Sequence, residues 1–229
     1  MERTLVRDAG HKIGECIALR GFVQTVRNQK SVQFIILRDH TGLIQIVAER
    51  SEANHQLNAL IEKLTRESAI EVSGMVMKNP NVKLGQLEVQ LQTLSVAAMS
   101  DATLPIDLFG KTETEVDKRM DWRFLDLRQP ENQLIFRVQT TVEMAMREFW
   151  ISNGFVEIHT PKIMGSPSEG GAELFTLDYF GQTASLAQSP QFYKQMAMAA
   201  GIDRVFEIGP AFRADPSFTP RHSTEFTSV

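Results

Sequence analysis

The chain has 229 residues, a formal net charge of −4 and 42% hydrophobic residues, a composition that is ordinary for a soluble protein. This length accommodates one large or two modest domains, and the negative charge leaves any RNA contact to local basic patches rather than to a global basic field. No apolar signal segment begins the chain and no run of about 18 apolar residues occurs, so we expect a cytoplasmic protein that does not enter membranes.

The single cysteine, Cys16, begins the first segment with strand character. One cysteine cannot form an intramolecular disulfide, which fits a reducing compartment. Because its neighbours are apolar, we predict that its side chain is buried and unreactive.

Apolar and polar residues alternate in five segments that we predict to be strands: residues 16–27, 31–38, 43–48, 68–77 and 86–96. Helical spacing of apolar residues over 51–65 predicts one helix between the third and fourth strands. Three strands, a helix and two strands is the order of a five-stranded OB barrel, a fold that often binds nucleic acid across one face. Another small β-barrel is equally compatible with this pattern.

Residues 101–130 mix acids and bases with little sustained apolar periodicity, and we interpret them as a hinge. Pro130 is suited to a helix start, and apolar spacing predicts a helix over 131–152 that ends at Asn153-Gly154. A strand over 155–158 follows. We therefore divide the chain into a barrel domain (1–100), a hinge (101–130) and a second domain (131–229).

The last part of the chain is predicted to form an antiparallel hairpin. A strand over 205–208, a break at Gly209-Pro210 and a run through Arg213 precede a polar loop, and apolar residues resume at Glu225 to Val229. Arg213, Arg221 and His222 would gather around this loop, and guanidinium groups bind phosphate oxygens in a bidentate manner. Surface ion pairing of these cations with nearby acids such as Glu207 is the alternative.

The order Phe212-Arg-Ala-Asp215, a loop and Arg221-His-x-x-Glu-Phe226 resembles motif 2 of the class II aminoacyl-tRNA synthetases, most closely the aspartyl enzymes. Leu186-Ala-Gln-Ser-Pro-Gln-Phe-Tyr-Lys-Gln195 resembles their amino-acid-binding segment. The resemblance implies a multidomain α+β protein, with an N-terminal five-stranded OB-fold barrel and part of a class II antiparallel-sheet catalytic domain. The helix over 131–152 then resembles motif 1, which forms the homodimer interface in that family, although an ordinary amphipathic core helix fits its periodicity equally well.

The resemblance implies roles in aspartate binding for four residues. Glu169 lies in Ser166-Pro-Ser-Glu-Gly-Gly, which resembles a flipping loop, and matches the position that holds the substrate ammonium. Lys194 matches the position that pairs with the side-chain carboxylate, while Ser189 and Gln191 match positions that contact the amino-acid backbone region.

For ATP, the resemblance implies that Arg213 is the catalytic residue. It would contact the α-phosphate of ATP and the carboxylate of the substrate. Arg221 and His222 match the pair at the distal phosphates, Glu225 matches the adenine contact and Phe226 matches the ring beneath the adenine. Asp215 stands where the family usually has glutamate, which shortens the reach of that side chain by one methylene group.

In the barrel, Phe34 lies where the family stacks an anticodon base on an aromatic ring, although a core phenylalanine between Val32 and Ile36 is the alternative. Gln45 matches a base-contacting position, and Arg27 and Lys83 are candidates for holding the RNA backbone. The segment Arg119-Met-Asp-Trp-Arg-Phe-Leu-Asp-Leu-Arg128 resembles the linking segment of the archaeal and eukaryotic-type enzymes, for which we expect interdomain packing.

The implied reaction uses ATP and L-aspartate to form aspartyl-adenylate, whose aspartyl group is then transferred to tRNA(Asp), with tRNA(Asn) left open as a second acceptor. Mg²⁺ is expected with ATP, with no metal ligands expected within this chain. Because no Gly-x-Gly-x-x-Arg of motif 3 is present, we expect the 229-residue chain by itself to be inactive. A non-catalytic RNA-binding module is the main alternative, and a tRNA-independent aspartate-activating enzyme is disfavoured by the barrel.

Overall fold

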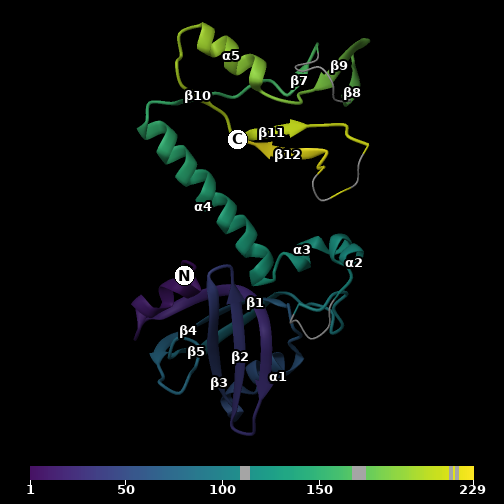
Figure 1. The fold of residues 1–229 in the computed structure, drawn as a ribbon. Helices are drawn as coiled ribbons and strands as arrows, with labels where there is room; N and C mark the ends of the chain where they lie inside the picture. Colours follow the sequence, from purple (N-terminus) through teal and green to yellow (C-terminus); the bar gives the residue numbers. More distant parts are fainter. Residues whose placement is uncertain (109–113, 167–173, 217–218, 220–221) are drawn as a thin grey trace. The chain divides into compact units, whose positions relative to one another are not determined.

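The computed structural model describes residues 1–108, 114–166, 174–216, 219 and 222–229 (Figure 1). It divides the chain into two compact units, Met1–Asp107 and Leu108–Val229. Each unit is described by itself.

The first unit is a closed five-stranded barrel. Its strands are β1 (Cys16–Asn28), β2 (Val32–Asp39), β3 (Gly42–Glu49), β4 (Ala69–Lys78) and β5 (Leu87–Ala98). They close in the order β1-β2-β3-β5-β4, and β3 and β5 pair in parallel while the other neighbours are antiparallel. The predicted OB barrel is thereby confirmed.

Short helices complete this unit, namely η1 (Val6–Lys12), η2 (Glu52–Asn54) and α1 (His55–Lys63). The helix predicted over 51–65 is therefore a 3-10 turn followed by an α-helix. The barrel core consists of branched aliphatic side chains that alternate inward along the strands, together with Ile61 of α1. The strand residues include Ile17, Leu19, Val23, Ile35, Leu37, Ile44, Ile46, Val72 and Val89.

Gly74 lets two barrel strands approach closely. A Cβ at this position would lie only 2.1 Å from the carbonyl oxygen of Gln90, so any other residue would push β4 away from β5. The pairing register of β4 and β5 shifts between Ser73 and Gly74, as expected for a bend at a barrel corner.

The prediction that Cys16 is buried is wrong. Its side chain is exposed, and its Sγ donates a hydrogen bond to Gln92 Oε1 at 3.0 Å. The reason is strand alternation, since Ile17 and Leu19 take the core-facing positions and leave Cys16 on the outside.

The second unit begins with two short helices, α2 (Val116–Asp121) and α3 (Arg123–Asp126). The Asp126 carboxylate is fully buried and pairs with the guanidinium groups of Arg119, at 2.7 Å, and Arg123. Burial alone would raise the pKa of Asp126, but these two cations outweigh it and hold the pKa below its usual value.

Helix α4 (Pro130–Ser152) follows, with Pro130 in its first turn and Gly154 at a φ of 78° just past its end. The predicted start and stop are thus confirmed, because proline suits the first helical position and glycine accepts the left-handed conformation. No residue of α4 is buried within this chain. No helix in the described ranges is long and apolar enough to span a bilayer.

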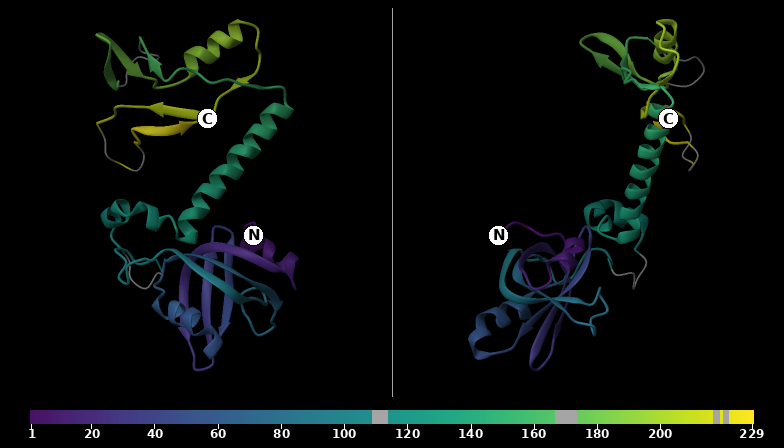
Figure 2. Two further views of the ribbon diagram at one scale, coloured as in Figure 1. Left: turned by 180° about the vertical axis from the view of Figure 1, so that it is seen from behind. Right: turned by 90° about the vertical axis from the view of Figure 1, so that its left-hand side faces the viewer.

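The remaining elements of the second unit are β6 (Val156–Glu157), β7 (Ile163–Met164), β8 (Thr176–Tyr179), β9 (Gln182–Leu186), α5 (Gln191–Ala199), β10 (Val205–Phe206), β11 (Gly209–Phe212) and β12 (Glu225–Ser228). They form a sheet of order β7-β9-β8, a parallel pair β6-β10 and the antiparallel hairpin β11-β12 (Figure 2). The hairpin is confirmed, but the predicted break at Gly209-Pro210 is wrong. These residues begin β11, and the interruption falls on Glu207 and Ile208.

A buried ion pair fixes the barrel where β2 ends. Arg38 Nη2 lies 2.7 Å from Glu67 Oε2, and the Glu67 side chain is only 1% exposed. Arg38 Nη1 also donates to Gln24 Oε1 at 2.6 Å. Gln24 is the extra residue of a bulge, since the register of β1 and β2 shifts between Val23 and Thr25.

We predict that Glu67→Gln lowers the free energy of unfolding by about 3–5 kcal/mol, because it leaves the Arg38 charge buried without a counter-charge. Urea unfolding followed by circular dichroism measures this loss. The matched control is Glu71→Gln, which breaks the exposed Arg20–Glu71 pair of 3.0 Å. The control should cost less than about 1 kcal/mol, and equal losses for the two variants would contradict the assignment.

Candidate functional site

Arg213 and Phe226 lie side by side on the C-terminal hairpin. Ala211 pairs with Phe226 in the ladder of β11 and β12, and the Arg213 amide donates to the Thr224 carbonyl at 3.0 Å. The guanidinium carbon of Arg213 lies 5.2 Å from the centroid of the Phe226 ring. A guanidinium held over an aromatic ring offers a fixed cation next to a flat apolar surface, and this combination suits a phosphate attached to a base.

Of the other residues predicted to bind ATP, Glu225 and His222 belong to the described part of the chain. Glu225 pairs with Phe212 in the same ladder and is exposed. The His222 amide donates to the Thr219 carbonyl at 3.0 Å, and its Nδ1 lies 2.7 Å from the Thr219 hydroxyl. Arg221, predicted to meet the distal phosphates, lies outside the described residues.

The predicted aspartate-binding segment forms the start of helix α5. The hydroxyl oxygen of Ser189 accepts a hydrogen bond from the amide of Gln191 at 3.0 Å, which fixes the side chain of Ser189 at the helix entrance. Gln191 and Lys194 are three positions apart on this helix, so they share one face. Glu169, predicted to hold the substrate ammonium, lies outside the described residues.

One backbone hydrogen bond of Ala187 joins the aspartate segment to the hairpin, and a second joins it to the segment that contains Lys162. The Ala187 amide donates to the Lys162 carbonyl at 3.0 Å, and the Ala187 carbonyl accepts from the Phe212 amide at 3.0 Å. Ser189 follows Ala187 by two residues, and Arg213 directly follows Phe212. The segments predicted to bind aspartate and ATP are therefore neighbours in space, although 25 residues separate Ala187 from Phe212 in the sequence.

No motif pointed to a role for Glu207, and surface ion pairing, the alternative considered for it, does not describe this buried residue. The Glu207 side chain is 2% exposed and lies 2.7 Å from Lys162 Nζ. Its carboxylate also accepts bonds from the Thr160 amide at 3.2 Å and from the Thr160 hydroxyl at 2.9 Å. We call these three residues the Glu207 cluster. The available signal was the position of Glu207 between Phe206 and Ile208, both of which are buried.

The electrostatics of this cluster keep Glu207 charged. Burial alone would raise the pKa of its carboxyl, but the hydrogen bonds from Lys162 and Thr160 and the Lys162 charge outweigh burial and hold the pKa below its usual value. Glu207 is therefore an ionised, buried and fully bonded group.

On the barrel, the outer face of β2 carries a second candidate site. Phe34 is half-buried and lies outside the core cluster, since Ile35 and Leu37 take the inward positions. Arg27 pairs with Phe34 across β1 and β2, and its guanidinium carbon lies 5.8 Å from the ring centroid. A half-buried ring on an outer face, flanked by a cation, is an arrangement that can stack a base and hold a phosphate.

Gln45 lies in the next row of the same face and donates through Nε2 to Glu88 Oε2 at 3.2 Å. Glu88 belongs to β5 and was not predicted from the sequence. Lys83 is exposed in the turn between β4 and β5. Among the predicted RNA-binding residues, Arg27, Phe34 and Gln45 therefore share one face, while Lys83 lies on a separate turn.

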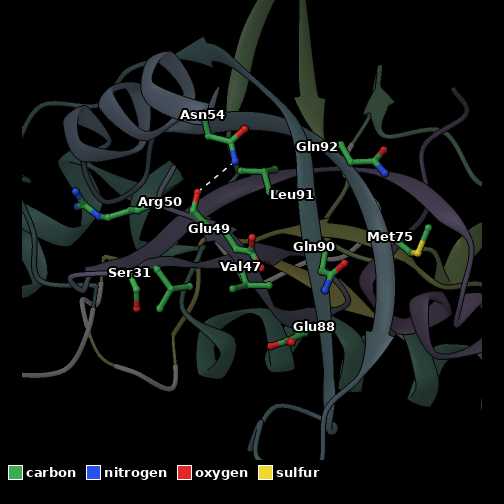
Figure 3. Close-up of a pocket in the computed structure, with 11 residues that line it drawn as sticks. Ser31, Val47, Glu49, Arg50, Asn54, Met75, Glu88, Gln90, Leu91 and Gln92 are labelled. Atoms are coloured by element: carbon green, nitrogen blue, oxygen red, sulfur yellow. Dashed lines mark hydrogen bonds between the residues drawn. The ribbon is translucent and has the colours of Figure 1, made fainter. Parts of the chain in front are cut away.

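A pocket of about 630 Å³ adjoins this face (Figure 3). Val47 of β3 lines this pocket, and it pairs with Phe34 of β2 and with Gln90 of β5. Carboxylates and amides dominate the remainder of its wall: Glu49, Asn54, Glu88, Gln90 and Gln92. Such groups accept and donate hydrogen bonds at base edges.

Among the described residues no three His, Cys, Asp or Glu side chains are grouped closely enough to hold a metal ion. The arrangement within the second unit instead consists of fixed cations, an aromatic ring and polar helix-start groups. Such groups are of the chemical types that bind phosphates, bases and small carboxylic acids.

Comparison with known proteins identifies the class. Residues 115–229 match the family model described as tRNA synthetases class II (D, K and N), and residues 17–97 match the model of the OB-fold nucleic acid binding domain. The first match covers about half of the chain, so the chain belongs to the class II tRNA synthetases of this group.

Within that class its curated relatives are aspartate–tRNA ligases, and the resemblance predicted from the motifs is confirmed. The chain is 45% identical over 216 residues to the Aspartate–tRNA(Asp) ligase of Pyrococcus horikoshii, covering 94% of this chain and 49% of that protein. It is 46% identical over 216 residues to the Aspartate–tRNA(Asp/Asn) ligase of Methanopyrus kandleri, covering 94% and 50%. The chain thus spans about half the length of the curated relatives it matches.

Solved structures agree with the class, and they include both asparaginyl and aspartyl enzymes. Asparaginyl-tRNA synthetase from Pyrococcus horikoshii, complexed with asparaginyl-adenylate, superimposes with a TM-score of 0.89 at 31% identity, covering 99% of this chain and 52% of that one. A putative aspartyl-tRNA synthetase from Leishmania major superimposes with a TM-score of 0.86 at 31% identity, covering 99% and 46%.

The charge state of Glu207 gives a prediction about acid stability. A carboxyl with a lowered folded-state pKa stabilises the fold above its unfolded-state pKa of about 4.3, and this contribution is lost as the pH falls through the folded-state value. The stability difference between the parent and Glu207→Gln should therefore shrink as the pH falls from about 7 to about 3.

Urea unfolding across this pH range measures that difference. Glu148→Gln, an exposed position on α4, serves as the control and should change stability by less than about 0.5 kcal/mol. A difference between the parent and Glu207→Gln that stays constant across the range would contradict the assignment.

Proposed function

We propose that the full-length product of the gene encoding this chain is an aspartate–tRNA ligase. The observation that carries the proposal is the hydrogen bond from the Phe212 amide to the Ala187 carbonyl, which puts the helix-start segment of Ser189 and Lys194 next to strand β11 and the Arg213 that follows it. One segment suits a dicarboxylic amino acid and the other suits a nucleotide, so their adjacency supports a reaction between the two substrates.

In the first step, an α-carboxylate oxygen of aspartate attacks the α-phosphorus of ATP, and pyrophosphate leaves. In the second step, a terminal ribose hydroxyl of tRNA attacks the aspartyl carbonyl, and AMP leaves. Positioning and charge neutralisation provide most of the catalysis in such phosphorus chemistry, so no protein nucleophile is required.

The proposed roles follow the motif resemblance, and the adjacency of the two segments supports them. Arg213 neutralises the α-phosphate and the attacking carboxylate, and Phe226 supports the adenine ring on the same hairpin. Lys194 pairs with the aspartate side chain, and Ser189 and Gln191 contact the backbone region of the substrate. Mg²⁺ would bridge and neutralise the ATP phosphates, with no protein ligand proposed within this chain.

The barrel face is proposed to read the tRNA anticodon, with Phe34 as the stacking platform and Arg27 and Gln45 beside it. The relatives include ligases named for tRNA(Asp) and for tRNA(Asp/Asn), so acylation of tRNA(Asn) is to be measured alongside tRNA(Asp). We place this reaction in the cytoplasm, where aspartyl-tRNA is used.

A homodimer is proposed through α4. The helix exposes large apolar side chains within this chain, including Leu134 at 57%, Ile135 at 60% and Phe149 at 64%. Apolar surface of this extent on one helix favours burial against another polypeptide segment, and a second copy would supply an equivalent helix.

We predict that the full-length protein catalyses aspartate-dependent ATP–pyrophosphate exchange and that Lys194→Met raises the KM for aspartate by about 10- to 100-fold, as expected for loss of one charge-assisted contact. Lys118→Met, the same change at an exposed position of α2, is the matched control and should leave the KM unchanged. Salt-sensitive tRNA binding without any exchange would overturn the proposal in favour of a non-catalytic RNA-binding protein.

For the barrel, we predict that Phe34→Leu weakens tRNA(Asp) binding by about 1–3 kcal/mol, because one base loses its stacking platform. Filter binding at fixed salt measures the change, and ATP–pyrophosphate exchange without tRNA is the internal control, which should remain at the parent rate. Parent-like tRNA affinity would show that Phe34 is only a packing residue.

A further inference from the structure

The Glu207 cluster lies where three segments of the second unit meet: the 160–162 segment, the aspartate segment and the strand that leads into β11. Glu207 stands between β10 and β11, and Thr160 and Lys162 lie between β6 and β7. None of these three residues was assigned to substrate binding. The burial of Glu207 and Thr160 calls for a role other than surface charge.

The cluster extends the parallel pairing of β6 and β10. The Ile158 amide donates to the Phe206 carbonyl at 2.9 Å, and directly beyond this bond the Thr160 amide and hydroxyl bind the Glu207 carboxylate. Lys162 Nζ closes the arrangement, at 2.7 Å from Glu207 Oε1 and 3.1 Å from the Thr160 hydroxyl. The side chain of Glu207 thereby ties the 160–162 segment to the strand that leads into β11.

The 160–162 segment is in turn bonded to the aspartate segment. The Lys162 carbonyl accepts from Ala187, whose own carbonyl accepts from Phe212 of β11. The result is a closed circuit of contacts that runs from Glu207 to Lys162, from Lys162 to Ala187, from Ala187 to Phe212, and back along β11 to Glu207.

The first residue of β11 leaves room for this circuit. A Cβ at Gly209 would lie 3.1 Å from Glu207 Oε1 and 3.6 Å from Lys162 Nζ. The ion pair therefore packs directly against the hairpin backbone, and a Cβ at this position would require the carboxylate to shift by a few tenths of an ångström.

From this geometry we propose that Glu207, acting through Lys162, is a positioning residue that sets the aspartate segment at the correct distance from the Arg213 strand. The proposal rests on the proposed function. The aspartate carboxylates would be held from two sides, by Lys194 on α5 and by Arg213 on the hairpin. The ATP contacts at Arg213, Glu225 and Phe226 belong to the hairpin alone.

Because aspartate would be held by two segments and ATP by the hairpin alone, removing the ion pair should change the KM for aspartate more than the KM for ATP. The ladder of β11 and β12 does not depend on Glu207, so the ATP contacts survive when the ion pair is removed. The aspartate contacts come from two segments whose spacing the cluster fixes, so they are weakened. A purely structural role would lower the amount of active enzyme and leave both KM values unchanged.

The test uses the full-length protein with the variants Glu207→Gln, Lys162→Met and the double variant. Either single variant leaves one partner buried without the other, whereas the double variant removes both and should fold best. We expect the KM for aspartate in ATP–pyrophosphate exchange to rise by about tenfold in the double variant, and the KM for ATP to stay within about twofold. The singles should show the same rise without adding up, because the two residues act as one unit.

Two further variants sharpen the result. Gly209→Ala crowds the carboxylate without removing a charge, and it should raise the KM for aspartate in the same direction by a smaller factor. Glu157→Gln removes the charge from a different ion pair of this unit, with Arg147 at 3.1 Å, and should leave both KM values at the parent level.

Parent-like KM for aspartate in the double variant and in Gly209→Ala would overturn the positioning role while leaving the proposed function intact. An equal rise of both KM values in the double variant would also overturn it. Absence of exchange in the parent would overturn the proposed function, and the positioning role with it.

Discussion

The second unit depends on one buried carboxylate being fully bonded. The Glu207 carboxylate is removed from water, and burying its charge without partners would cost free energy. Lys162 supplies the counter-charge, and Thr160 supplies two hydrogen-bond donors. The Lys162 carbonyl also accepts a hydrogen bond from the Ala187 amide. The ion pair of Glu207 and Lys162 therefore also constrains the spacing between the aspartate segment and β11. The proposed substrate contacts of Arg213 and Lys194 are arranged around this constraint.

In the barrel, too, a buried carboxylate is stabilised by a cation from a distant part of the sequence. Arg38 and Glu67 form a buried pair at the end of β2, and Arg38 also holds Gln24 at a bulge of β1. The inward positions of the strands are left to aliphatic residues, and the outer face keeps Phe34 beside Arg27. In both units, buried ion pairs fix backbone positions, while residues proposed to meet ligands remain on accessible surfaces.

Much of this could be predicted from the sequence. The barrel strands, α4 and the terminal hairpin follow from period-two alternation, from Pro130 and from Gly154, which are local signals. Exposure of Cys16 was missed because an apolar run does not tell which alternate residues face inward. Glu207 was missed because its partners are about 45 residues away in the sequence, and no local pattern reveals a long-range ion pair. The roles assigned by motif resemblance stay predictions, and Glu169 and Arg221 lie outside the described residues.

The central claim is that the Arg213 hairpin and the α5 start form one site for an aspartyl-adenylate. The most direct measurement is a crystal structure of the full-length protein with a non-hydrolysable aspartyl-adenylate analogue. The account predicts the analogue's phosphate-mimicking group at Arg213, its adenine on Phe226 and its side-chain carboxylate at Lys194. An analogue bound away from these residues, or contacting Arg213 but not the α5 start, would contradict it.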